Sequence, residues 1–284
     1  MRKQTLMKQA EESNSQLSSA TGGRRQSLIT FIDIIVAAGI FVVLWQIVFQ
    51  LKFYPSYLLP SPAMTLNRFV ALVRNGELRI ALTATLERLV VGLSVSLVAG
   101  TSIGLLMANF KRFGRVMSSF SLGLQSFPSI AWVPFAILIV GLNNYGILFV
   151  VIISSVFSMM ISTYNGVRNI NPIYLKASKN MGVSRLSLIR SVLLPASTPS
   201  IITGVRQTWS FAWHALIGAE MLMASVGIGA VLYYGAQFIN MSQVVASMIV
   251  IFTIGVLVDR LLFYRLETRV RATRGLVVGN SAQF

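Results

Sequence analysis

Residues 147–195 read ILFVVIISSVFSMMISTYNGVRNINPIYLKASKNMGVSRLSLIRSVLLP, an apolar run followed by a polar and basic one. The first part, Ile147–Val167, is 21 residues long and contains no charged side chain. A helix needs about 20 consecutive apolar residues to cross the hydrocarbon core of a bilayer, so this part predicts a transmembrane helix. The second part, 168–195, carries five basic residues and no acidic one. It predicts a segment that lies outside the bilayer.

The composition of the whole chain also indicates a membrane environment. Of its 284 residues 55% are hydrophobic and 11% are charged, and the mean hydropathy is +0.71. Water-soluble domains carry about a quarter charged residues, so lipid is the expected environment of this chain. There is no cysteine, and the single histidine, His214, cannot supply a set of imidazole ligands. We therefore expect no cofactor or metal bound by this chain.

Six apolar runs are long enough to cross a membrane. They are Ile29–Leu51, Leu89–Asn109, Leu122–Val140, Ile147–Val167, Ser200–Met223 and Val244–Tyr264. The chain is thus predicted to be an all-α integral membrane protein with six transmembrane helices. The third run contains Pro128 and Pro134, and each proline removes a backbone donor, so we expect a kink there.

The basic residues are distributed unevenly among the connections between these runs. Eighteen of the 24 lysines and arginines lie before the first run, between the second and third, between the fourth and fifth, or at the end of the sixth. Only Lys52, Arg68, Arg74 and Arg79 fall on the other side, while Arg88 lies at the start of the second run and Arg206 inside the fifth. Because positively charged loops stay in the cytoplasm, both termini are predicted to be cytoplasmic. The same asymmetry accounts for the net charge of +16 without nucleic acid, which such a charge otherwise suggests.

These observations divide the chain into three parts. Residues 1–28 are polar and predict a disordered cytoplasmic tail. Residues 29–265 form the predicted membrane domain, and residues 266–284 form a cytoplasmic C-terminal tail. The apolar run after the N-terminal tail is too long for a signal peptide, and no small-residue cleavage site follows it.

Two further patterns predict local structure. Between the first two runs, apolar residues recur at helical spacing and predict an amphipathic helix at the outer surface. They are Leu66, Phe69, Val70 and Val73. In the second run a small residue stands at every fourth position, which predicts close packing against a neighbouring helix. These residues are Gly92, Ser96, Gly100, Gly104 and Ala108.

The polar segment 169–195 has signals for two short helices. Asn171 followed by Pro172 is a typical N-cap and first-turn pair. Gly182 permits the left-handed conformation that ends a helix, so the first helix is predicted to end at Met181. Ser184 can cap a second helix, which is predicted to end before Pro195. A pair of helices outside the membrane suggests that another protein binds there.

The same segment resembles the signature of permease subunits of ABC importers. That signature has glutamate and two alanines, then three residues, a glycine, nine residues, an aliphatic residue, any residue, leucine and proline. The matching positions are Lys176, Ala177, Ser178, Gly182, Val192, Leu194 and Pro195. The spacing agrees throughout, but Lys176 replaces the glutamate and Ser178 replaces an alanine. The resemblance implies that residues 169–195 form a coupling loop, which binds in a groove of the cytoplasmic ATPase subunit.

Further strings place the resemblance in the nitrate, sulfonate and taurine subgroup of these permeases. They are LLPSP at 58–62, FPSIAWVPFAIL at 127–138, ITGVRQTW at 202–209 and GAEML at 218–222. The resemblance implies the type I permease fold, a location in the bacterial inner membrane, and transport of a small anion such as nitrate, a sulfonate, taurine or bicarbonate. It also implies a second permease copy, two ATPase subunits and an extracytoplasmic solute-binding protein. Whether the second copy is identical is left open.

The chain contains no nucleotide-binding motif of the form GxxxxGK[ST]. It is therefore not expected to be an enzyme, and a separate ATPase subunit would bind ATP and magnesium. The chain also lacks paired carboxylates or a nucleophile beside a base, which argues against a membrane-embedded enzyme. The remaining alternative is a channel or secondary transporter that uses the polar face of the fifth run.

That face carries ionisable side chains at membrane depth, where they are costly and usually mark a pathway or an internal pair. Arg206, Ser210, Trp213, His214 and Glu220 fall within an arc of about 120° on a helix. The face should meet either the translocation path or a helix within the bundle. Further candidates for the path lie around Pro128, and they are Gln125, Ser126, Ser129 and Trp132. At the end of the sixth run, Asp259 is expected to pair with its neighbour Arg260.

Overall fold

The computed structural model describes residues 33, 36–266, 268 and 270, which fall into two compact units, 1–64 and 65–284. In the first unit, the helix Val36–Gln50 is followed by a turn, and Trp45 Nε1 donates a hydrogen bond to the Pro60 carbonyl over 3.0 Å. The predicted tail 1–28, the beginning of the first run and nearly all of the predicted C-terminal tail lie outside the described residues.

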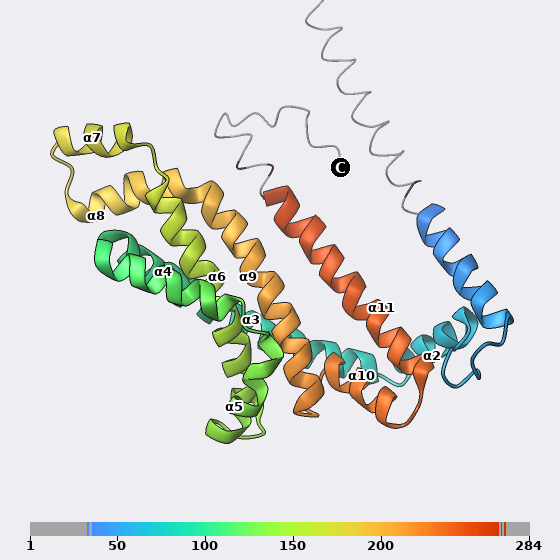
Figure 1. The fold of residues 1–284 in the computed structure, drawn as a ribbon. Coiled ribbons are helices and arrows are strands. Elements are labelled where there is room, and N and C mark those ends of the chain that lie inside the picture. Colours follow the sequence, from blue (N-terminus) through green and yellow to red (C-terminus); the bar gives the residue numbers. More distant parts are fainter. Residues whose placement is uncertain (1–32, 34–35, 267, 269, 271–284) are drawn as a thin grey trace, which may run out of the picture. The chain divides into compact units, whose positions relative to one another are not determined.

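All regular structure in the described part of the chain is helical, as the sequence predicts (Figure 1). The elements are α2 (Pro62–Arg74), α3 (Glu77–Asn109), α4 (Lys111–Gln125), a 3₁₀ turn (Ser129–Ala131), α5 (Trp132–Ile139), α6 (Asn144–Arg168), α7 (Pro172–Asn180), α8 (Arg185–Leu188), a π-helical turn (Ile189–Leu193), α9 (Leu194–Leu222), α10 (Ile228–Gln237), α11 (Met241–Val258) and a second π-helical segment (Asp259–Tyr264).

Among the described residues, three helical segments are long and apolar enough to cross a membrane: α3, α6 and Met241–Tyr264. A fourth is possible if α4 and the segment Ser129–Ile139 form one broken span. Helix α9 has 29 residues but is less apolar. The count of six spans therefore stays a prediction.

The predicted kink in the third run is confirmed, and it is a complete break. Helix α4 ends at Gln125, and the following helical segment is inclined to it by 91°. Pro128 has an extended ψ of 125°. Proline also restricts the residue before it, Phe127, to non-helical conformations. The chain therefore leaves the axis of α4 before it enters α5.

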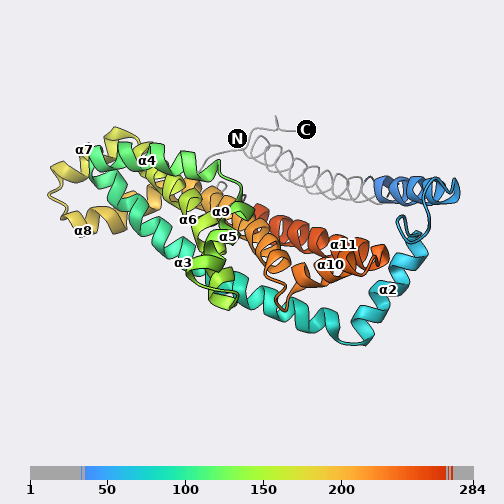
Figure 2. The ribbon, with the colours of Figure 1, turned by 60° about the horizontal axis from the view of Figure 1, so that its bottom comes forward.

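Helix α6 packs against both α3 and α9, and Figures 1 and 2 show it alongside α9. The small residues of α3 make the close approach possible. A Cβ atom on Gly100 would overlap the side chain of Met159, and one on Gly104 would overlap the α6 backbone at Met160. At a further contact between α3 and α6, the Ser155 hydroxyl donates to the Ser96 hydroxyl over 2.8 Å. The predicted packing role of this stripe is confirmed.

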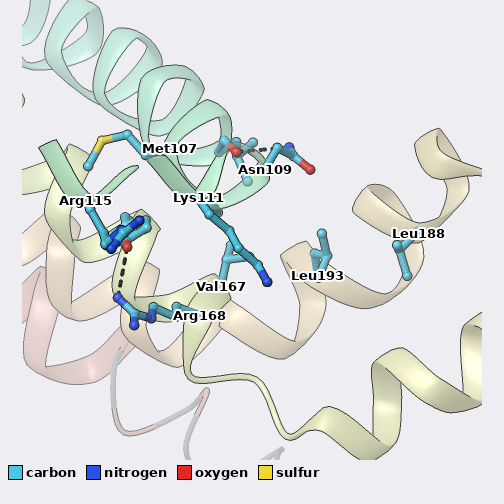
Figure 3. Close-up of a pocket in the computed structure, with 11 residues that line it drawn as sticks. Met107, Asn109, Lys111, Arg115, Val167, Arg168, Leu188 and Leu193 are labelled. Atoms are coloured by element: carbon cyan, nitrogen blue, oxygen red, sulfur yellow. Dashed lines mark hydrogen bonds between the residues drawn. The ribbon is translucent and has the colours of Figure 1, made fainter. Parts of the chain in front are cut away.

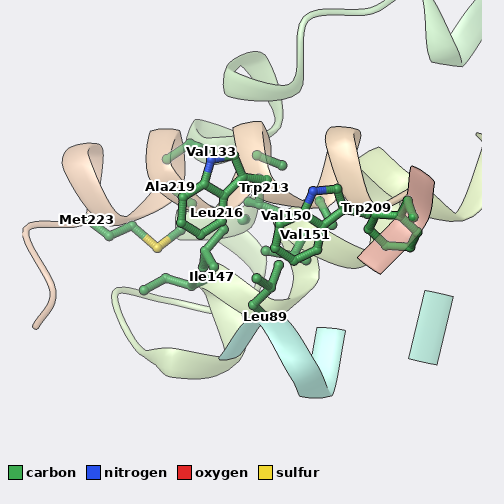
Figure 4. Packing of buried hydrophobic residues seen from close by; sticks show 14 residues of the cluster. Leu89, Val133, Ile147, Val150, Val151, Trp209, Trp213, Leu216, Ala219 and Met223 are labelled. Atoms are coloured by element: carbon green, nitrogen blue, oxygen red, sulfur yellow. The ribbon is translucent and has the colours of Figure 1, made fainter. Parts of the chain in front are cut away.

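The largest apolar cluster lies among α3, α6 and α9 (Figure 4). Leu89, Val150 and Leu216 contribute one buried side chain from each helix. Trp209 and Trp213 stack on each other one helical turn apart in α9, with ring centroids 5.7 Å apart. This cluster holds α9, the helix with the predicted polar face, against the rest of the bundle.

The predicted amphipathic helix is present as α2, and its N-cap is Ser61, whose Oγ accepts from Met64 N over 3.1 Å. Its most buried apolar side chain is Leu72, which packs with Leu78 and Ile228. Leu72 is not in the predicted apolar series, and Leu66 of that series is exposed. The buried face of α2 is therefore displaced by about one residue from the face predicted from the sequence.

Candidate functional site

The 169–195 loop begins with the predicted cap. Asn171 Oδ1 accepts from Ile173 N over 3.0 Å at the start of α7. At the other end of α7, Gly182 has φ +68°, and Val183 N donates back to the Ser178 carbonyl over 3.2 Å. This bond and the left-handed glycine form a Schellman motif. The helix–glycine geometry predicted from the sequence is confirmed.

The second half of the loop differs from the prediction. Ser184 Oγ caps α8 by accepting from Ser187 N, but the helix does not end before Pro195. The chain continues through the π-helical turn Ile189–Leu193 directly into α9, whose second residue is Pro195. Proline at this position removes one backbone donor, and it stands directly after the π-helical turn, where the helical hydrogen-bond pattern changes. The loop and α9 are thus one continuous helical path.

The signature residues divide between the surface and the packing of the loop. Lys176, Ala177 and Gly182 are exposed and Ser178 is buried. The others, Val192, Leu194 and Pro195, are partly buried.

Large apolar side chains beside the signature residues face solvent. Ile173 is 68% exposed, Tyr174 59% and Met181 80%. Figure 1 shows α7 and α8 at one end of the bundle, beyond α4 and α6. The outer surface of α7 can therefore take a protein partner.

The predicted polar face of α9 does not act as one surface. Glu220 is fully buried, and its carboxylate accepts hydrogen bonds from Thr85 Oγ1 at 2.9 and 3.0 Å and from Gly229 N at 3.1 Å. Its charge is balanced by Arg88 of α3, whose Nη1 lies 2.7 Å from Oε1. Trp213 is buried in the apolar cluster.

Near the middle of α9, Arg206 forms a bidentate ion pair with Asp259, in which Nε–Oδ1 and Nη2–Oδ2 are both 2.6 Å. The expectation that Asp259 pairs mainly with Arg260 is wrong. Neighbouring side chains on a helix diverge by about 100°, whereas Arg206 reaches Asp259 from the facing helix.

Ser210 and His214 are the exposed members of the set. They line a groove of about 490 Å³ with residues of α10 and α11, among them Leu232 and Phe252. His214 Nδ1 lies 2.7 Å from the Ser210 carbonyl oxygen, which orients the ring along α9. A solute in this groove would meet one imidazole, one hydroxyl, the Asp259 carboxylate, which is paired with Arg206, and largely apolar walls.

Two of the candidates near Pro128 lie on either side of the helix break. Gln125 is the last residue of α4 and is half-buried. Trp132 begins α5 and makes edge-to-face contacts with Phe127 and Phe135, at centroid distances of 5.3 and 5.9 Å. Neither lines the groove of Ser210 and His214. In the described segments, His, Asp and Glu side chains nowhere gather in threes, so these segments assemble no metal centre.

Arg88 is the residue that sequence reasoning placed at a span without recognising its role. Its signal was present, because an arginine at the edge of one apolar run and a glutamate within another are costly at membrane depth and usually mark a pathway or an internal pair.

Comparison with known proteins identifies the family. The model described as the binding-protein-dependent transport system inner membrane component matches residues 100–272, more than half of the chain. The chain belongs to this family. It is the permease component of an ABC importer and a multi-pass protein of the inner membrane.

Named relatives of this permease agree with the resemblance seen in the sequence. The nitrate import permease of Synechocystis sp. is 27% identical over 238 residues, which cover 81% of this chain and 86% of the relative. The putative aliphatic sulfonates transport permease of Bacillus subtilis is 27% identical over 231 residues, which cover 81% of this chain and 83% of the relative.

A solved structure confirms the fold. A chain of the MetNI methionine ABC transporter superposes with a TM-score of 0.59 and 19% identity, covering 68% of this permease and 95% of that chain. At this identity the likeness concerns the architecture alone.

Proposed function

We propose that this permease moves a small anionic nutrient, of the nitrate, sulfonate, taurine or bicarbonate type, across the inner membrane by alternating access. The substrate class is supported by the relatives named for nitrate and for aliphatic sulfonates.

The observation that carries the coupling mechanism is the continuous path from the 169–195 loop into α9. In this proposal a separate ATPase subunit, which binds ATP and magnesium, holds the exposed surface of α7 around Ile173, Tyr174 and Met181. Movement of the ATPase then shifts α8, the π-helical turn and α9 together, because no break separates them. Rigid-body motion of such an element is how alternating access is commonly achieved.

The proposed assembly has two permease copies around a shared path, two ATPase subunits, and a solute-binding protein on the outer side. Each copy has six spans, with the broken segment α4–α5 and the less apolar α9 counted among them, and both termini are cytoplasmic. The distribution of basic residues supports this orientation, because it puts the 169–195 loop on the ATPase side.

In the proposed path, Ser210 and His214 face the solute, because they line an open groove in this conformation. Arg206 and Glu220 act less directly, since each is paired with an opposite charge on a neighbouring helix. Their pairs set the position of α9, whose rotation or shift would widen or close the groove. Three further candidates border the helices that move in this proposal, and they are Trp213, Gln125 and Trp132.

The test is reconstitution of the permease in proteoliposomes with the ATPase and binding protein of its own transport system. Uptake of labelled nitrate, an aliphatic sulfonate and bicarbonate is compared with uptake of methionine, a zwitterionic control. We expect ATP-dependent uptake of at least one of the three test solutes. Uptake of methionine alone would refute the substrate class, and uptake driven by an ion gradient without the ATPase would favour a secondary transporter.

A further inference from the structure

A cavity of about 520 Å³ opens where α3 and α6 end and α4 begins (Figure 3). The second half of the 169–195 loop closes one side through Leu188 and Leu193. The volume is within the range of small-molecule sites, roughly 300–1,000 Å³. The cavity is separate from the groove of Ser210 and His214, which involves other helices.

The polar part of this cavity is cationic. Lys111 and Arg115 come from α4, and Arg168 comes from the last turn of α6. As far as the structure describes the chain, no acidic side chain is among the lining residues. The N-terminal end of α4 brings the positive end of a helix dipole, whereas the C-terminal ends of α3 and α6 bring negative ends, so the three side-chain cations set the sign of the cavity. The cavity therefore attracts an anion.

One of these cations is held in place by its own helix. Arg168 Nη1 donates to Tyr164 Oη over 3.0 Å, and its guanidinium carbon lies 5.8 Å from the Tyr164 ring centroid. Figure 3 shows Lys111 directed between Val167 and Leu193. The three cations thus line one cavity from two helices, and the contacts that already order Arg168 lower the entropic cost of binding.

Apart from Asn109 and Tyr164, the rest of the lining is apolar. It consists of Leu105, Met107, Ala108, Val167, Leu188 and Leu193. A small inorganic anion would leave this wall without a partner. A ligand with an anionic head and an apolar body would occupy both parts of the cavity.

The location supplies the source of such a ligand. Helices α3 and α6 are both apolar enough to cross a membrane, and both end at the cavity. Their ends lie at the level of the lipid head groups. Basic pockets at the ends of transmembrane helices are known to bind phospholipid head groups. We propose that this cavity binds the phosphate group of an anionic phospholipid through Lys111, Arg115 and Arg168.

Such a lipid would connect the α3–α4 corner to the 169–195 loop, since Leu188 and Leu193 belong to the loop. The inference does not depend on the transported solute or on the ATPase. It can be tested on the purified permease alone, so its failure would leave the proposed function untouched.

The experiment measures the thermal midpoint of the detergent-purified full chain with phosphatidylglycerol, phosphatidylcholine or inorganic phosphate. Native mass spectrometry counts bound lipid in the same samples. We expect phosphatidylglycerol to bind and to raise the midpoint, whereas phosphatidylcholine and inorganic phosphate do not at equal concentration. A rise with inorganic phosphate equal to that with phosphatidylglycerol would refute the lipid assignment and indicate a free-anion site.

Two double variants with equal loss of charge separate the cavity from general surface charge. Lys111→Gln with Arg115→Gln should weaken phosphatidylglycerol binding roughly tenfold or more, because two of the three cations are removed. Arg112→Gln with Arg265→Gln changes exposed residues outside the lining and should weaken it less than about twofold. Equal weakening in both variants, or no binding by the unmodified permease, would overturn the proposal.

Discussion

Arg88 and Glu220 form a buried ion pair between α3 and α9, although 132 positions separate them in the sequence. The Arg88 guanidinium also donates to Asn144 Oδ1 of α6 at 2.8 and 3.1 Å, to Ser225 Oγ at 3.0 Å and to the Val226 carbonyl at 2.5 Å. The pair therefore joins three long helices and the turn before α10. Its side chains are 9% and 0% exposed, so water cannot replace a lost partner.

The first prediction concerns this pair. Glu220→Ala should lower the free energy of unfolding by about 3–5 kcal/mol, because it leaves Arg88 buried without a counter-charge. The double variant Arg88→Leu, Glu220→Leu should lose less stability than the sum of the losses in Arg88→Leu alone and Glu220→Leu alone. Thermal unfolding of purified protein measures both. Glu87→Gln, at an exposed position of α3, is the control and should have little effect. Additive costs in the double variant would show that the pair is not coupled.

The second prediction concerns the turn that encloses the carboxylate. A Cβ atom on Gly227 would overlap the Glu220 carboxyl group, whereas nothing lies within 4 Å of such an atom on Gly123. Gly227→Ala should therefore destabilise the fold by about 1–3 kcal/mol. Gly123→Ala, in the last turn of α4, should be neutral or stabilising by up to about 1 kcal/mol. Thermal midpoints of the two variants should move apart, and a neutral Gly227→Ala would contradict the described packing.

The third prediction concerns Gly182, which has φ +68°. No atom lies within 4 Å of a Cβ added at this position, so only the backbone conformation restricts which residue fits. Gly182→Pro should abolish ATPase binding and transport, because proline holds φ near −65°. Gly182→Asn should retain most of both, since asparagine tolerates the left-handed region. Co-purification of the ATPase subunit and ATP-dependent uptake are the measurements. Normal co-purification with the proline variant would remove the coupling role of the loop.

The fourth prediction separates transport from stability at His214. The ring is exposed and its described hydrogen bond is to its own helix, so His214→Ala should cost less than about 1 kcal/mol of stability. Uptake per folded molecule should nevertheless change at least severalfold if the groove is the path. Thr253→Ala on α11 is the matched control, since its exposed hydroxyl also bonds within its helix, to the Ile249 carbonyl at 2.7 Å. A loss of stability with unchanged uptake would assign His214 a packing role.

The fifth prediction concerns topology. The chain has no cysteine, so single cysteines at Ser187 and Asn75, both exposed, can be labelled selectively. An impermeant thiol reagent should label Asn75→Cys from outside intact cells and Ser187→Cys only after the cells are opened. Labelling of both positions from the same side would refute the six-span orientation.

Local structure could be predicted from the sequence because the interactions that form it lie within a few residues. The Asn171 cap, the left-handed Gly182 and the break at Pro128 each depend on a side chain and its nearest backbone. The membrane environment followed from composition, and the permease family from the spacing of residues 176–195. Small residues at every fourth position of α3 also predicted close packing, although not that α6 is the partner.

Only the tertiary structure determined which distant groups meet. Glu220 and Arg206 lie in one arc of a helical projection, yet Glu220 pairs with Arg88 of α3 and Arg206 with Asp259. The convergence of Lys111, Arg115 and Arg168 on one cavity likewise depends on how α4 crosses the end of α6. An ionisable group in a low-dielectric interior requires a partner, and the sequence shows this requirement. The partner itself is set by helix packing, because many pairings of helices satisfy the same apolar pattern and only one arrangement also places the opposite charges in contact.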